Sequence, residues 1–140
     1  MHFNVNWIAV IAAAVASFAV GSVWYMALSR QWLAASGRTR EDINARDMAP
    51  FIIGFICQLV MAYFMALVTP ALFGPVSVWS GLLAGAHMWL GFVITTMILN
   101  HRYQGRPWSL TAIDGGYLLL ALLAQGIVIG LFGGGGAPAA

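Results

Sequence analysis

The side chain in this sequence that could most directly do chemistry is Asp114, the one charged group inside an apolar run. A carboxylate is costly in hydrocarbon, so its presence there indicates a functional site with a partner nearby. Arg102 and Arg106, in the polar stretch just before it, could bend back to pair with it. The alternative is that Asp114 caps the start of a helix, where the positive end of the helix dipole stabilises an acid.

Three uncharged polar side chains also fall within apolar runs. Gln125 follows Asp114 by about three helical turns, so the two are predicted to share an inward face. Gln58 belongs to a series of otherwise small residues that recur at every fourth position, and it is predicted to form a hydrogen bond to another helix. His87, near the middle of its run, could ligate a tetrapyrrole or relay protons; the alternative is a neutral imidazole hydrogen-bonded to an adjacent helix.

No reaction can be assigned from motifs. The sequence contains no recognisable nucleophile with its base, no metal-ligand cluster and no phosphate-binding loop, so we expect no catalytic residues and no metal site. The chain also contains no lysine, which excludes a retinal or pyridoxal Schiff base. These features predict a non-enzymatic protein.

The elements that position these side chains follow from composition. The chain is 61% hydrophobic and 7% charged, with a mean hydropathy of +0.87, whereas about 25% of the residues in a soluble domain are charged. In lipid, backbone polar groups must be satisfied internally, which leaves helices or a closed barrel. The apolar runs are continuous rather than alternating, which favours helices. We therefore expect an all-α integral membrane protein, an antiparallel bundle of two hairpins.

Four transmembrane helices are predicted, at residues 7–28, 50–73, 79–99 and 110–132, in a domain over 1–133 that is followed by a flexible tail at 134–140. Pro50 suits the first turn of the second helix, and Pro70 should bend or end it. In the loop between the first two helices, Thr39 and Asp42 resemble a capping box, which predicts a short interfacial helix to about Met48.

Small residues mark the predicted packing faces. The first helix carries Ala9, Ala13, Ser17 and Gly21 at every fourth position, and the third carries Gly81 and Gly85 as a GxxxG pair. All six arginines fall in the first and third loops, so both termini are predicted to be periplasmic in a bacterial inner membrane. The basic charge is too small and too local for nucleic-acid binding.

Several short motifs resemble a known family. Asn4 and Asn6 precede a helix that ends in the sequence GSVWY, the run WLGF leads to Asn100, and Gly116 and Tyr117 stand early in the last helix. This pattern is similar to the small bacterial membrane family catalogued as domain of unknown function 1761, over nearly the whole chain. The resemblance implies a four-helix inner-membrane protein without assigned chemistry. In that pattern an uncharged polar residue would stand at Asp114.

We expect a non-enzymatic accessory or assembly subunit that packs its small-residue faces against a larger membrane complex, respiratory or photosynthetic, or against itself. The alternative is a small oligomeric carrier or channel whose polar route includes Asp114, Gln58, His87 and Gln125. Expected partners are the lipid bilayer and either other membrane-protein subunits or further copies of the chain. A tetrapyrrole at His87 is the one cofactor considered.

Overall fold

The computed structural model describes residues 4–133, so the tail predicted at 134–140 lies outside the described residues. Within 4–133 the chain is helical and without strands, and four helical segments are long and apolar enough to cross a membrane. They are α1 (Trp7–Ala27), α3 (Ala49–Phe73), the segment Val78–Tyr103 and α6 (Trp108–Phe132). The predicted fold class, with four helices able to cross a membrane, is confirmed.

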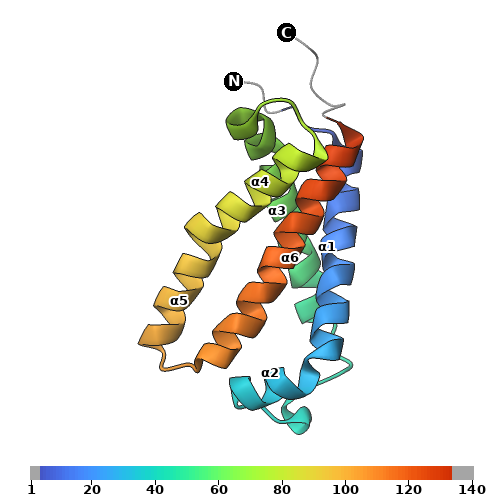
Figure 1. Ribbon diagram of the computed structural model, residues 1–140. Coiled ribbons are helices and arrows are strands. Elements are labelled where there is room, and N and C mark those ends of the chain that lie inside the picture. The colour runs from blue at the N-terminus through green and yellow to red at the C-terminus, as the bar shows by residue number, and fades with distance from the viewer. Residues whose placement is uncertain (1–3, 134–140) are drawn as a thin grey trace.

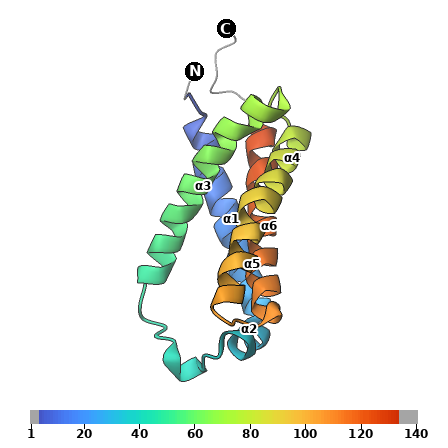
Figure 2. The same cartoon turned by 90° about the vertical axis from the view of Figure 1, so that its left-hand side faces the viewer.

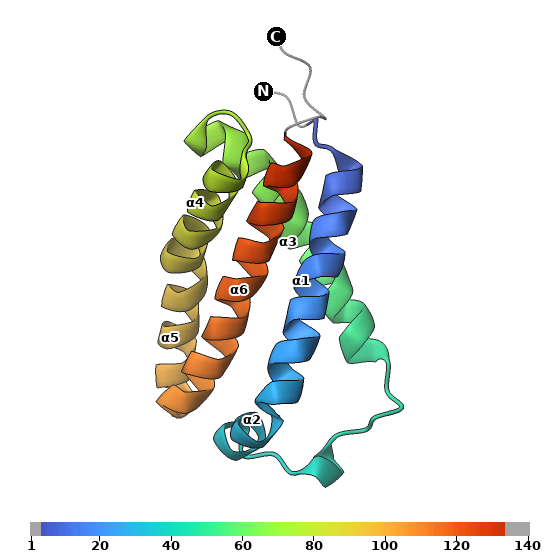
Figure 3. The same ribbon diagram turned by 45° about the vertical axis from the view of Figure 1, so that its right-hand side comes forward.

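The bundle is built around α1 and α6, which lie side by side (Figures 1 and 3). In the apolar 18-residue stretch that defines each span, 33% of the residues are buried in α1 and 39% in α6, against 17% in α3 and 11% in the third span. The central pair therefore forms the core, and α3 and the third span flank it. Towards its N-terminal end α3 diverges from α1 and α6 (Figures 2 and 3).

Both polar loops lie at the same end of the bundle, which we call the loop end. It carries α2 (Ser29–Ser36), the short turn η1 (Arg40–Asp42) and the turn between α5 (Ile94–Tyr103) and α6 (Figure 1). The start of α1, the end of α6 and the connection from α3 to α4 (Val78–Met88) lie at the opposite end. All six arginines of the chain are consequently at the loop end.

The third span is longer than predicted, and it is not one uniform helix. A π-helical turn, Trp89–Val93, separates α4 from α5, which continues to Tyr103 rather than ending at residue 99. The chain then turns through Gly105, at φ +67°, and α6 begins after Pro107. The basic side chains in the last turn of α5 suit the negative end of the helix dipole, which explains the extension.

The predicted helix from residue 39 to about 48 is wrong. The α-helix in this loop is α2, and the residue that caps its C-terminal end, Gly37, has a left-handed backbone conformation. Arg40–Asp42 form a single 3₁₀ turn. The capping contact itself is present, because the Thr39 N–H donates to Asp42 Oδ2 at 2.8 Å. Beyond it, the side chains of Asn44 and Asp47 accept from backbone N–H groups two residues on, and such local bonds compete with helix formation.

The two prolines of α3 behave differently. Pro50 lies in the first turn of the helix, as predicted. Pro70 does not end the helix, which continues for a further turn to Phe73. Because proline has no backbone N–H, Pro70 removes one internal hydrogen bond from the helix, and it does so close to the C-terminal end.

Candidate functional site

Three buried polar side chains meet at the centre of the bundle, one each from α1, α3 and α6. Ser17 Oγ donates to Gln58 Oε1 at 2.7 Å, and Gln125 Nε2 donates to the same oxygen at 2.8 Å. Gln125 Nε2 also lies 3.0 Å from Ser17 Oγ. Each of the three is at most 3% exposed, so the cluster joins three helices where water is excluded. The predicted role of Gln58 as a contact between helices is confirmed.

Two tyrosines extend this cluster towards the loop end. Gln58 Nε2 donates to the hydroxyl of Tyr117, whose ring lies edge-on to that of Tyr25 with centroids 5.2 Å apart. Tyr25 Oη in turn donates to Asp114 Oδ1 at 2.6 Å. Gly21 makes room for this arrangement, because a Cβ there would come within 3.0 Å of Tyr117 Cζ. Hydrogen bonds thus join Asp114 to Tyr25 and Tyr117 to the buried cluster, and the two sets meet at the ring contact between the tyrosines. We call this series of contacts the polar chain.

Asp114 neither caps α6 nor pairs with an arginine, so both of these predictions are wrong. Since α6 begins at Trp108, Asp114 lies more than one turn inside the helix and cannot cap it. Arg102 donates to Thr111 and stacks over the Trp108 ring at 3.6 Å, and Arg106 donates to the Ser36 carbonyl at 3.0 Å. Both arginines are held by other groups, so the partner of Asp114 is a tyrosine of α1.

The backbone on either side of Asp114 is held by two tryptophans. Trp24 Nε1 donates to the Ile113 carbonyl at 2.9 Å, and Trp89 Nε1 donates to the Gly115 carbonyl at 2.8 Å. The first tryptophan comes from α1 and the second from the π-helical turn. These bonds fix the segment of α6 that carries the acid.

On either side of Gln125, glycines bring α4 and α6 into close contact. A Cβ on Gly81 would lie 2.6 Å from the carbonyl carbon of Gly126, and one on Gly85 would lie 2.8 Å from the Leu122 oxygen. The predicted packing role of Gly81 and Gly85 is confirmed. Gly126 and Gly130, which stand at the same GxxxG spacing on α6, were not predicted, although this spacing is visible in the sequence.

The small-residue faces are used inside the bundle. In α1 the stripe Ala9, Ala13, Ser17 and Gly21 is buried, as predicted for a helix-packing face. Because this stripe and the Gly81–Gly85 face contact other helices of the same chain, they are not available to an external partner. Association with another subunit would therefore use a different surface of the bundle.

His87 is apart from the polar chain. Its side chain is exposed, Nδ1 lies 2.7 Å from the Leu83 carbonyl of its own helix, and its ring packs beside Phe73 with centroids 5.0 Å apart. The predicted hydrogen bond to an adjacent helix is thus wrong. Within residues 4–133, no group of three or more His, Cys, Asp or Glu side chains could hold a metal ion.

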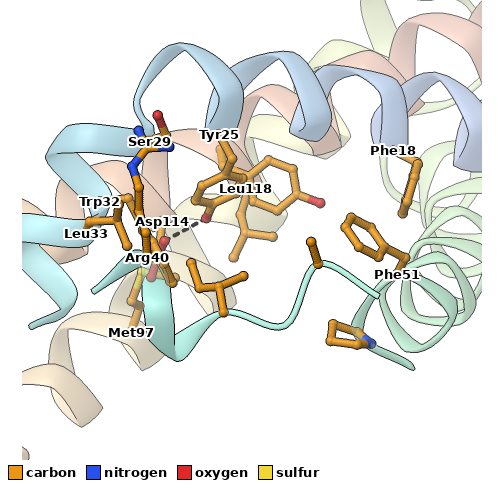
Figure 4. A pocket seen from close by; sticks show the side chains of 14 residues that line it. Phe18, Tyr25, Ser29, Trp32, Leu33, Arg40, Phe51, Met97, Asp114 and Leu118 are labelled. Atoms are coloured by element: carbon orange, nitrogen blue, oxygen red, sulfur yellow. Dashed lines mark hydrogen bonds between the residues drawn. The ribbon is translucent and has the colours of Figure 1, made fainter. Parts of the chain in front are cut away.

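A pocket of about 880 Å³ opens at the loop end, where α3 diverges from α1 and α6 (Figure 4). Asp114 and Arg40 line one end of it, close to Ser29, Trp32 and Leu33 (Figure 4). The other end is apolar and aromatic, with Phe18 and Phe51, and Tyr25 lies between the two ends. The remaining lining residues are Ile43, Ala45, Pro50, Met97, Tyr117 and Leu118. This pocket was not predicted from the sequence.

Helical spans, an internal polar chain and a half-open pocket define the class of this molecule: a multi-pass α-helical membrane protein. Within that class, the family model described as protein of unknown function (DUF1761) matches residues 8–130. The chain belongs to this family, as its short motifs suggested. No curated protein and no solved structure matched the chain.

Proposed function

We propose that the protein is a non-enzymatic accessory or assembly subunit that associates with a larger membrane complex, or with a second copy, through the outer face of α4 and α5. The observation that carries this proposal is the position of His87. Its ring is exposed, and Nδ1 is bonded within its own helix, so Nε2 has no partner among residues 4–133. His87 is about 14 Å from the start of its span, so in a bilayer that nitrogen would lie within the hydrocarbon.

An unpaired polar group in hydrocarbon costs about 1–3 kcal/mol or more, so a partner helix that bonds Nε2 would be favoured. The surroundings of His87 suit such a contact. Leu90 and Phe92 are 61% and 70% exposed, and Thr95 and Asn100 are also exposed. Large apolar side chains flanked by a few polar groups are typical of helix interfaces in membranes.

Cross-linking between cysteines in native membranes tests this proposal. The native Cys57 is exposed on the outer face of α3, so the unchanged chain reports on that face. The double variant Cys57→Ser, Leu90→Cys reports on the α4–α5 face instead. With a short bifunctional thiol reagent, we expect a cross-linked species of higher mass only from the Leu90→Cys chain.

The mass of the cross-linked species distinguishes a second copy from a different subunit. Adding His87→Leu to the Leu90→Cys chain should reduce the cross-linked fraction several-fold, because the partner loses its bond to Nε2. Equal cross-linking from both faces, or from neither, contradicts the proposal.

We further propose that the protein resides in a bacterial inner membrane with both termini in the periplasm. The support is the distribution of arginine: all six lie at the loop end, and basic loops remain on the cytoplasmic side.

The polar chain supports an alternative, a small oligomeric carrier. It extends from the loop end only as far as the cluster at Gln125, and close glycine contacts between α4 and α6 lie on either side of that residue. A route across the membrane would therefore need a second copy. Proton flux into liposomes that stops in Asp114→Asn, with the oligomer intact, would favour this alternative.

A further inference from the structure

The pocket at the loop end has an unusual combination of linings. It lies between the charged loop and the apolar spans, so in a bilayer it would lie near the lipid headgroups. Asp114 and Arg40 bring one negative and one positive group to that end, and the opposite end is aromatic and apolar (Figure 4). The lining therefore changes from charged to apolar within one pocket, as the surface of an amphiphile does.

The two charged groups have bonding capacity left for a ligand. Tyr25 occupies Oδ1 of Asp114, and Oδ2 has no hydrogen bond within the part of the chain that the structure describes. The guanidinium of Arg40 likewise has no hydrogen bond to the described residues, and the side chain is exposed to the pocket. One group can accept a hydrogen bond from a cation, and the other can donate to an anion.

We propose that this pocket binds phosphatidylethanolamine, with its ammonium group on Asp114 and its phosphate on Arg40. The headgroup of this lipid carries one hydrogen-bond-donating cation and one anion, and so offers a partner to each of the two charged side chains. Its upper acyl chain would lie against Phe18 and Phe51. A pocket of about 880 Å³ holds the headgroup and part of the chains rather than a whole lipid.

Other common phospholipids fit less well, and each tests a different contact. Phosphatidylglycerol has a phosphate for Arg40 but no cation, so it leaves the charge of Asp114 without a partner. Phosphatidylcholine carries a quaternary ammonium that has no N–H to donate to Oδ2. The expected order of affinity is therefore phosphatidylethanolamine, then phosphatidylcholine, then phosphatidylglycerol.

The experiment is a titration of the purified full-length chain with the three lipids, matched in acyl chains and followed by native mass spectrometry. We expect one tightly bound phosphatidylethanolamine, at least about tenfold tighter than phosphatidylglycerol, since one charge-assisted hydrogen bond is worth about that factor. Brominated acyl chains on the same lipid should also quench the fluorescence of Trp32, which lines the pocket. Equal affinities for all three lipids overturn the proposal.

Three variants assign the contacts. Asp114→Asn still accepts from Tyr25 but loses its charge, so it should bind phosphatidylethanolamine and phosphatidylcholine equally. Arg40→Gln should weaken both by a similar factor of about ten. Arg38→Gln is the matched control, because Arg38 donates to the Asp42 carbonyl and does not line the pocket. An unchanged lipid preference in Asp114→Asn, or an Arg38→Gln effect equal to that of Arg40→Gln, contradicts the assignment.

Discussion

Adding one methyl group at Gly81 should force α4 and α6 apart. A Cβ there would lie 2.6 Å from the carbonyl carbon and 2.9 Å from the Cα of Gly126, closer than the 3.0 Å that real Cβ contacts respect. The neighbour is backbone, which cannot rotate out of the way as a side chain would. Separation of the two helices is the only relief, and overpacking of this kind costs about 1–3 kcal/mol.

Gly91→Ala is the matched control for Gly81→Ala. Gly91 lies in the same span, and a Cβ there meets nothing within 4 Å. Both variants gain the helix propensity of alanine, about 1 kcal/mol, so this gain cancels when they are compared. The difference between them isolates the steric cost.

The free energy of unfolding in mild detergent, measured by denaturant titration and followed by circular dichroism, provides the comparison. We expect Gly81→Ala to be less stable than Gly91→Ala by about 1–3 kcal/mol. Equal stability of the two variants would refute the reasoning, because it would mean that α4 and α6 do not approach closely at Gly81.

Further predictions concern the buried cluster, the loop, the orientation and the histidine. Gln58→Leu removes the partner of three hydrogen-bonding side chains and should lower the free energy of unfolding by about 1–3 kcal/mol. The Thr39 N–H holds the pKa of the Asp42 carboxyl below its usual range. The contribution of this turn to stability is therefore complete above the usual carboxyl pKa, and it is lost as the pH falls through the lowered pKa. An NMR titration of Asp42 should give the lowered midpoint. A reporter fused after Ala140 should be active only in the periplasm, and cytoplasmic activity would reverse the orientation. The purified chain should show no visible absorbance that His87→Leu abolishes, whereas such absorbance would indicate a bound tetrapyrrole.

Much of the fold could be predicted because it depends on patterns that are local in sequence. Apolar runs long enough to cross a membrane predict spans wherever they occur. The spacing of Gly81 and Gly85 similarly indicates close approach, since only small residues allow two backbones to touch. Neither inference requires knowing which helix lies beside which.

The candidate site could be predicted only in part, because its contacts join residues far apart in sequence. Tyr25 and Asp114 are 89 positions apart, and no local spacing connects them. The cap predicted for Asp114 failed because Pro107 starts α6 at Trp108, earlier than hydropathy indicates. For His87, periodicity could not show that its helix face points away from the bundle.

The π-helical turn Trp89–Val93 has a consequence for how the third span is aligned with other sequences. Gly85 and Ile94 both contact α6, the latter against Gly115, yet nine residues of regular α-helix make about two and a half turns and would place them on opposite faces. The wider turn rotates α5 back towards α6. The span therefore consists of two α-helices in different registers, and the wider turn between them is equivalent to the insertion of one residue. A helical wheel drawn over the whole span assigns its second half to the wrong side, and a relative lacking that residue would present a different face of α5 to the bundle.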